Sequence, residues 1–441
     1  MPTNIDKNQP EFAAFVGIDW ADRKHVCAVQ GADLSTIEYG EIEHTPEAVE
    51  AWAIELARRF SQRPVAVALE QVRGALVFML TKYEHLVVFP VHPATLANYR
   101  KSFRPSGAKS DPHDAALLLD VLVRHREKLR RIDPDIVETR TLQFLVEERR
   151  KLVQERIRFA QRLSAHLKLY FPQVLGWFGE ISSQIAGDFL ERWPTLEHLQ
   201  KAKPTTVKRF FAEHNSRRSE KIDKRTEEIR CAVPATRDAA VIVSSSSAAV
   251  ALVRILQQIR DAIASYDGQI DTLARQHPDF AIFDSLPGAG AALAPRLIAA
   301  LGTRRDRYRT AHEIQCYSGI APVVESSGKQ HWVHYRWSCP KFLRQTFHEW
   351  ALHSIPYSRW AKAYYERQRA RGKSHHTAVR SLAFKWIRIL FRCWQDRTPY
   401  NELLYEQALA RHSQEPDDSR APVQFEWKTC AGFSKISSIT S

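Results

Sequence analysis

Four carboxylates stand where folding could bring them together around a metal ion. Asp19 ends the apolar stretch 15–18, Glu70 ends the apolar stretch 64–69, and Asp111 and Asp114 open an apolar segment. Mg²⁺ binds through a few carboxylates, with waters and phosphates as its other ligands. Two such ions about 4 Å apart activate a nucleophile and stabilise a leaving oxygen in phosphoryl transfer. We therefore expect these four residues to be catalytic ligands of Mg²⁺ or Mn²⁺. Taken alone, Asp19 fits a turn residue equally well, and Asp111 and Asp114 fit helix capping better than metal binding.

A serine is the second group that could do chemistry. Ser327 precedes Gly328 in a basic neighbourhood. A serine hydroxyl attacks a phosphodiester when its proton is removed and cations stabilise the charge on the phosphate. Residue type alone favours an ordinary turn serine here. No GxSxG motif is present, so the sequence does not support an acyl hydrolase.

The two strand-end carboxylates need a sheet to position them. Alternating patterns predict five strands, at 15–20, 26–29, 38–42, 64–70 and 86–91, and helices at 45–60 and 74–84. Strands that alternate with helices imply an α/β layer with parallel pairing, and ligands bind where such strands end. A helix that begins near Ser110 would place Asp111 and Asp114 on one face, because they are three residues apart.

The remainder of the chain reads as mostly helical. Near-heptad patterns predict long helices at 136–169 and 249–276, which we expect to form an antiparallel coiled-coil linker with an inserted helical segment at 170–248. The pattern at 282–301 predicts two helices joined by a glycine-containing hairpin. This is either a helix-hairpin-helix element, which binds a phosphate, or a tight turn between helices without a ligand. A loop at 317–329 and a strand at 331–337 come next. Helices are expected at 340–354, 357–371 and 376–394.

The positive charge is concentrated in one part of the chain. Residues 287–400 hold 20 Lys and Arg against 6 Asp and Glu, an excess of 14 that equals the net charge of the whole chain. Such a concentration favours a nucleic-acid partner over a generally basic surface. Trp332, Tyr335 and Trp337 could stack on bases or belong to a core. The candidate phosphate-binding residues are Lys329, Arg336, Lys341, Arg344 and Lys373.

Composition excludes several classes of protein. The six cysteines are scattered without a CxxC pair, which supports neither a disulfide framework nor a zinc site. The polar residues 1–11 lack the apolar core of a signal peptide, and we expect no membrane span and no membrane partner. A cytoplasmic protein of a bacterium or archaeon is expected.

Taken together, these motifs resemble the DEDD-type insertion-sequence transposases, a group that includes the bridge-RNA-guided recombinases. The resemblance covers roughly residues 12–130 and 281–400. It is carried by Val16-Gly17-Ile18-Asp19, Ala68-Leu69-Glu70, Lys109-Ser110-Asp111-Pro112-His113-Asp114-Ala115, Leu286-Pro287-Gly288-Ala289-Gly290, and Gly319-Ile320-Ala321-Pro322 followed by Ser327-Gly328.

The resemblance implies a fold, a chemistry and partners. The fold class would be α/β plus α, with a RuvC-like (RNase H-type) mixed sheet at 12–132, the linker at 133–280, a transposase domain at 281–410 and a flexible tail at 411–441. Asp19, Glu70, Asp111 and Asp114 would bind the metal, and Ser327 would attack DNA and become covalently linked to it, with Ser326 as a neighbouring hydroxyl. Donor and target DNA, a structured guide RNA and a homo-oligomer, dimer or tetramer, would be the partners.

Two other functions remain open at this stage. A RuvC-like nuclease would cut with metal-activated water and leave Ser327 without a chemical role. A non-catalytic nucleic-acid-binding protein would use the carboxylates only for capping and solubility.

Overall fold

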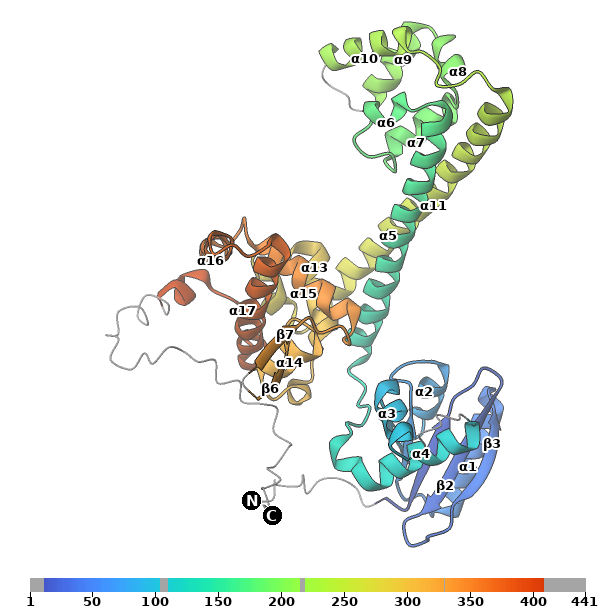
Figure 1. Cartoon of the computed structure of the whole chain (residues 1–441), viewed down its shortest axis with the longest axis vertical. Coiled ribbons are helices and arrows are strands. Elements are labelled where there is room, and N and C mark those ends of the chain that lie inside the picture. The colour runs from blue at the N-terminus through green and yellow to red at the C-terminus, as the bar shows by residue number, and fades with distance from the viewer. Residues whose placement is uncertain (1–11, 104–109, 215–218, 329, 408–441) are drawn as a thin grey trace. The chain divides into compact units, whose positions relative to one another are not determined.

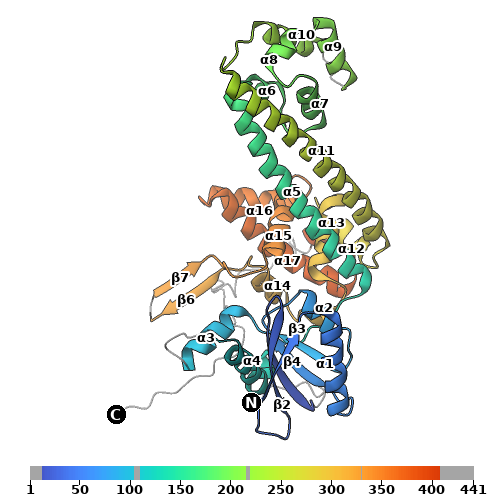
Figure 2. The same ribbon diagram turned by 90° about the vertical axis from the view of Figure 1, so that its right-hand side faces the viewer.

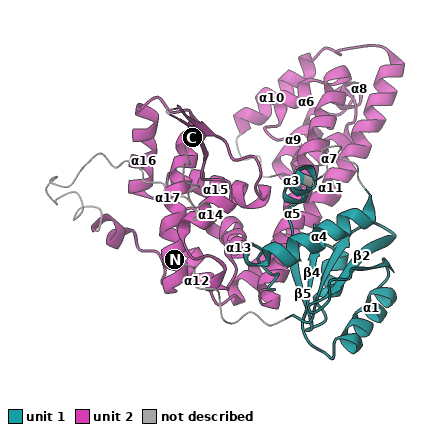
Figure 3. Ribbon diagram, turned by 60° about the horizontal axis from the view of Figure 1, so that its bottom comes forward, with its two compact units in different colours: residues 1–134 teal, residues 135–441 magenta. Residues whose placement is uncertain are grey.

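The computed structural model describes residues 12–103, 110–214, 219–328 and 330–407. The chain divides into two compact units, residues 1–134 and 135–441 (Figure 3). Each unit has its own hydrophobic cores.

Unit 1 is a mixed five-stranded sheet with helices packed on it. Its strands are β1 (Ala14–Asp19), β2 (Lys24–Gly31), β3 (Glu38–Glu43), β4 (Val65–Leu69) and β5 (Leu86–Pro90), in the order β3-β2-β1-β4-β5. The β1–β4 and β4–β5 pairs are parallel, as the alternating pattern predicts. The β1–β2 and β2–β3 pairs are antiparallel, so the sheet is mixed. A mixed RNase H-like sheet with flanking helices is confirmed.

The helices described in this unit are α1 (Pro46–Arg59), α2 (Ala75–Leu80), α3 (Pro93–Phe103) and α4 (Asp111–His125), followed by the short η1 (Arg126–Lys128). Helix α1 begins as predicted, because the Thr45 side chain accepts a hydrogen bond from the Ala48 amide. The sequence pattern did not indicate α3. Its carboxyl-terminal half is the basic stretch around Arg100.

Unit 2 contains two long antiparallel helices, α5 (Val137–Tyr170) and α11 (Ala239–Gln276), which pack along each other (Figure 1). Leu142 of α5 shares one core with Ile270 of α11, and Leu163 of α5 shares another with Leu252 of α11. Helix α11 begins ten residues before the predicted start at 249. The Ser244–Ser247 run lies inside it, because serine continues a helix whose other side chains pack.

One end of this helical pair carries the inserted segment, whose short helices close a core rich in aromatic side chains. The segment consists of α6 (Gln173–Trp177), α7 (Gln184–Arg192), α8 (Leu196–Gln200), α9 (Pro204–Glu213) and α10 (Ser219–Cys231).

The other end joins the helical carboxyl-terminal region. Its elements are α12 (Phe280–Asp284), α13 (Gly290–Leu301), η2 (Arg305–Arg307), α14 (Ala311–Tyr317), β6 (Val323–Ser327), β7 (Gln330–His334), α15 (Lys341–Ser354), α16 (Arg359–Ala370) and α17 (His375–Asp396). Trp350, Trp386 and Trp394 are fully buried at its centre. The expected loop at 317–329 is wrong in part, because residues 323–327 pair with β7 as an antiparallel strand.

Helix α11 is the one described helix that is long and apolar enough to cross a membrane by length and composition. This differs from the expectation drawn from unbroken apolar runs, because the small residues of 239–256 keep the segment apolar. Its packing along α5 and its buried residues in both cores of unit 2 identify it as a core helix of this unit.

Candidate active site

Asp19 and Glu70 lie at the same edge of the sheet in unit 1. The last paired residues of the parallel strands β1 and β4 are Ile18 and Leu69, so Asp19 and Glu70 follow at matching positions. Side chains at matching positions of parallel strands point to the same face of the sheet. Both residues are partly exposed at the carboxyl end of their strand. The sheet therefore brings two of the four predicted carboxylates together at one edge.

Gly17 allows α4 to cross this face of the sheet at close range. A Cβ at Gly17 would collide with the backbone oxygen of Ala115 and would lie 2.5 Å from the Leu119 nitrogen. Gly17 and Asp19 point to the same face, because side chains alternate along a strand. Asp114 directly precedes Ala115 in the chain, so the first turn of α4 lies close to β1, two residues before Asp19. This close approach explains why a glycine stands within β1.

Asp114 and Asp111 occupy different environments in the first turn of α4. Asp114 is buried, with 1% of its surface exposed, whereas Asp111 is exposed. The Arg100 guanidinium of α3 donates from Nε to Asp114 Oδ1 at 2.8 Å, and its Nη2 forms an ion pair with the same oxygen at 2.7 Å. Asp114 Oδ2 is buried without a hydrogen-bond partner among the described residues. A buried carboxylate oxygen without a partner is costly and is a suitable cation ligand.

The fit of this edge to a divalent cation can be judged from its donor atoms. Within the described residues, no group of three or more His, Cys, Asp and Glu side chains is close enough to hold a metal ion as it stands. The oxygen-rich set Asp19, Glu70, Asp111 and Asp114 nevertheless has the chemistry that Mg²⁺ and Mn²⁺ require. Two further buried atoms, Gln71 Oε1 and His113 Nε2, also lack a hydrogen-bond partner in the described segments and belong to residues adjacent to this set in the chain. The residues fit a hard cation.

Ser327 is the last residue of β6, in unit 2. Ser327 pairs with Gln330 across a tight hairpin whose turn contains Gly328 at a φ of 56°. A positive φ favours glycine, which accounts for the Ser-Gly pair in the sequence. Residues 324–328 are exposed, and Figure 2 shows the hairpin extending from the helices of its unit. Ser326 pairs with His331 and points to the opposite face of the hairpin.

The five basic residues selected from the sequence have different surroundings. Lys329 lies outside the described residues. Arg336 donates to the backbone oxygen of Ala321 at 3.3 Å and to that of Pro322 at 3.5 Å, which supports the start of the hairpin. Lys341 and Arg344 line a pocket at the base of the hairpin. Lys373 is exposed in the turn between α16 and α17.

Sequence reasoning missed four residues of these sites. Arg100, the partner of Asp114, stood in a basic stretch with no visible target. Arg150, His376 and Arg380 line the same pocket as Lys341 and Arg344. The spacing of three residues from Lys341 to Arg344, and of four from His376 to Arg380, puts each pair on one helical face. That spacing was a usable signal, whereas nothing in the sequence connects Arg150 to either pair.

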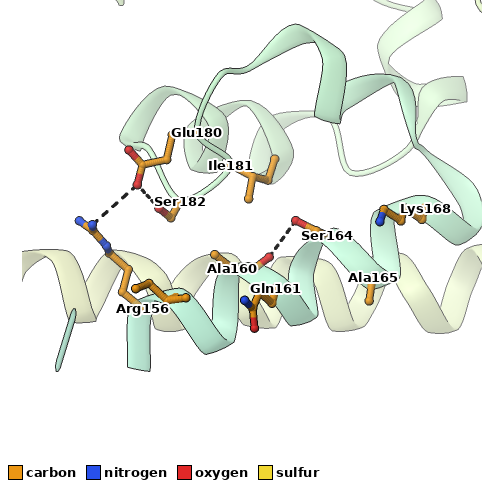
Figure 4. Close-up of a pocket in the computed structure, with 10 residues that line it drawn as sticks. Arg156, Ala160, Gln161, Ser164, Ala165, Lys168, Glu180, Ile181 and Ser182 are labelled. Carbon is orange, nitrogen blue, oxygen red and sulfur yellow. Dashed lines mark hydrogen bonds and ion pairs between the residues drawn. The ribbon is translucent and has the colours of Figure 1, made fainter. Parts of the chain in front are cut away.

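A second pocket, of about 470 Å³, lies in unit 2 between α5 and the loop that follows α6 (Figure 4). Its polar side chains largely pair with one another or with the backbone. Arg156 approaches Glu180 at 3.8 Å, Ser182 donates to Glu180 at 2.6 Å, and Ser164 donates to the backbone oxygen of Ala160 at 2.9 Å. This internal pairing leaves few groups for a ligand.

Comparison with known families matches two parts of the chain. The DEDD-type IS110 transposase model matches residues 16–172, and the model described as "Transposase IS116/IS110/IS902 family" matches residues 281–366. The first range contains the four carboxylates and the second contains Ser327.

Similar proteins align along nearly the whole chain. The mini-circle putative transposase for IS117 of Streptomyces coelicolor is 27% identical over 408 residues, which cover 89% of this chain and 97% of the relative. The insertion element IS900 uncharacterized 42 kDa protein of Mycobacterium paratuberculosis is 23% identical, covering 89% and 98%. The insertion element IS116 uncharacterized 44.8 kDa protein of Streptomyces clavuligerus is 25% identical, covering 87% and 95%.

The two family matches occur on one chain, and together they span more than half of it. A DEDD-type domain implies the use of a divalent metal, and a transposase binds DNA and transfers phosphoryl groups. The chain belongs to the IS110 family of transposases, with a DEDD domain in its amino-terminal part and the second transposase domain in its carboxyl-terminal part.

Proposed function

We propose that this transposase exchanges DNA strands through a covalent serine–DNA intermediate, formed with divalent cations bound at the acidic sheet edge. The observation that carries the proposal is the matched position of Asp19 and Glu70 on neighbouring parallel strands, with α4 crossing the same face. Carboxylates at one edge are what a phosphoryl-transfer site with hard cations needs.

Asp19, Glu70, Asp111 and Asp114 would hold the cations, Mg²⁺ or Mn²⁺. When bound there, such ions supply positive charge that stabilises a reacting phosphate. Gly17 keeps α4 against β1 and so keeps Asp114 at the edge. Arg100 orients the Asp114 carboxylate through Oδ1 and leaves Oδ2 without a protein partner among the described residues.

Ser327 would be the nucleophile. Its Oγ forms a bond to phosphorus while one P–O bond of the DNA strand breaks. The hydroxyl proton passes to solvent, and the leaving oxygen takes up one proton from solvent, so the released strand ends in a hydroxyl. The exposed hairpin supports this assignment, because an attacking hydroxyl must reach a DNA backbone without steric obstruction.

The finer architecture in this proposal has three functional parts: the RuvC-like domain at 12–132, the coiled-coil linker at 133–280 and the serine-bearing domain at 281–410. Within the third part, the turn between α12 and α13 is of the helix-hairpin-helix type. Nothing lies within 4 Å of the place where a Cβ of Gly290 would stand, so a phosphate could approach the start of α13. Gly288, by contrast, packs against the His353 backbone of α15.

The proposal includes a structured guide RNA and assembly of several copies of this chain, as the resemblance implies. The concentration of basic residues in 287–400 supports a polyanionic partner of either kind.

An adduct assay tests the serine chemistry. The full chain, with flanking transcript and Mg²⁺, is incubated with labelled element-end DNA and resolved on a denaturing protein gel. We expect a labelled protein–DNA adduct from the wild type, and its loss in Ser327→Ala and in Asp19→Asn, both of which should remain folded.

Ser326→Ala is the matched control, because it removes the neighbouring hydroxyl on the opposite face of the hairpin. It should retain the adduct. An adduct that persists in Ser327→Ala and disappears in Ser326→Ala would move the assignment by one residue. Cleaved DNA without any adduct would identify the water-using nuclease and refute the serine intermediate. Binding without cleavage at any Mg²⁺ concentration would favour the non-catalytic alternative.

A further inference from the structure

A basic pocket of about 340 Å³ lies in unit 2 at the base of the β6–β7 hairpin. Arg150 of α5, Lys341 and Arg344 of α15, and His376 and Arg380 of α17 line it. Tyr335, which directly follows β7, also lines the pocket. Three helices from distant parts of the chain thus direct cationic side chains toward one hollow.

The pocket is lined by cations without acidic side chains among them in the part of the chain that the structure describes. Among the described lining residues there is no Asp or Glu, and Arg150, Arg344 and Arg380 form no ion pair in the described part of the chain. Glu349 is an acidic residue of α15, the helix that also carries Lys341 and Arg344. It accepts hydrogen bonds from Arg296 and from Gln345. Its two carboxylate oxygens are therefore already engaged.

The guanidinium groups are also crowded and partly desolvated. The guanidinium carbon of Arg380 lies 3.9 Å and that of Arg344 5.1 Å from the centre of the Tyr335 ring, so two like charges lie close to one aromatic ring. Arg150 Nε is buried and has no hydrogen-bond partner within the described parts of the chain. Burial lowers the pKa of Arg150 and of Arg380, and nearby Arg296 adds to the first effect. Burial and the Arg380 charge lower the pKa of His348 to about 4. Burial is the largest cause of all three shifts, and it outweighs the opposing charges of Glu147 and Glu349 near Arg150.

We propose that this pocket binds one backbone phosphate of the DNA strand on which the transposase acts. A phosphate offers several acceptor oxygens, and guanidinium groups recognise it with paired donors. The pocket would deepen the proposed function by fixing the register of the strand. Phosphate binding itself does not depend on the serine chemistry.

The hairpin sets the expected distance between this phosphate and the reacting one. Tyr335 lies at the base of the hairpin and Ser327 at its tip, with the five residues of β7 between them. At about 3.3 Å per residue this span is roughly 17 Å. Because a duplex rises about 3.4 Å per nucleotide along each strand, the bound phosphate should lie about five nucleotides from the one that Ser327 reaches.

The test is a binding experiment on the full chain in EDTA, so that no strand is cut. DNA affinity is titrated against salt for the wild type, for Arg150→Gln and for Arg380→Gln. Each variant removes a charged donor to phosphate, which should weaken binding by about 10- to 100-fold. Each variant should also reduce the slope of log affinity against log salt concentration by about one. Arg392→Gln is the matched control, because Arg392 is an exposed residue of the same helix outside the pocket.

A scan with neutral methylphosphonate linkages then locates the phosphate. One linkage about five nucleotides from the cut site should weaken wild-type binding and have no further effect in Arg380→Gln. Equal losses of DNA affinity in Arg380→Gln and Arg392→Gln would overturn the proposal. So would a loss from every methylphosphonate linkage that adds to the loss caused by Arg380→Gln. The proposal would also be overturned if the variants lost affinity only for a single-stranded RNA of the same sequence and bound DNA as the wild type does. These outcomes are independent of adduct formation, so failure of the serine mechanism would be seen separately.

Discussion

Gly17→Ala should weaken the packing of α4 on β1 at the acidic edge, the sheet edge that carries Asp19 and Glu70 beside Asp114 of α4. It changes none of these carboxylates. The added Cβ collides with the Ala115 backbone oxygen and comes within 2.5 Å of the Leu119 nitrogen, both part of α4. Backbone atoms cannot move aside as a flexible side chain would, so α4 must shift away from β1. Overpacking of this kind costs about 1–3 kcal/mol. A shift of α4 also moves Asp114 relative to Asp19.

Hydrogen exchange followed by mass spectrometry on the full chain measures this cost locally. A loss of about 1–3 kcal/mol corresponds to exchange roughly 5- to 150-fold faster in the peptides of β1 and α4, if they open together. Gly268→Ala is the control. Gly268 lies within α11 with nothing within 4 Å of its Cβ position, so this change should increase protection by helix propensity. Unchanged protection of β1 and α4 in Gly17→Ala would refute the close packing of α4 on β1.

Three further substitutions or conditions test other parts of the structure. Burial and nearby His44 lower the pKa of His25 from 6.5 to about 4, so the unfolded chain binds this proton more readily. The free energy of unfolding of unit 1 should therefore be highest above pH 6.5 and fall by at most about 3 kcal/mol towards pH 4. Hydrogen exchange measures this, and a profile that does not change with pH would contradict it. Asp279→Ala removes the partner that receives two 2.6 Å hydrogen bonds from Arg305, and should cost unit 2 about 3–5 kcal/mol in urea unfolding; a loss under 1 kcal/mol would count against the buried pair. Thr45→Ala removes the cap of α1 and should cost about 1 kcal/mol, seen as faster exchange of α1 alone.

The strand ends that carry Asp19 and Glu70 were predictable because their signals are local. A run of β-forming residues that ends on a carboxylate predicts a strand end, and two such runs separated by a helix predict parallel neighbours. The structure places Asp19 and Glu70 accordingly. The Arg100–Asp114 contact was not predictable, because it depends on α3, a helix whose weakly amphipathic sequence gives no periodic signal.

The carboxyl-terminal region was harder to predict for two physical reasons. Strand β6 has one partly buried residue and four exposed ones, so it lacks the apolar alternation by which strands are recognised. The basic pocket draws Arg150 from α5 and Arg380 from α17, which are 230 positions apart. Helical spacing links residues within one helix, but only the tertiary fold decides which helix faces are adjacent.

Separate cores have a consequence for how variants of this transposase should be interpreted. The carboxylates depend on the cores of unit 1, whereas Ser327 and the basic pocket depend on the large helical core of unit 2. A destabilising change in one unit should therefore leave exchange protection of the other unit near its wild-type level. If Gly17→Ala abolishes the adduct while the β6–β7 hairpin and α15 keep their protection, the loss must come from the geometry of the acidic edge. A mechanism in which Ser327 acted without those carboxylates could not produce that result.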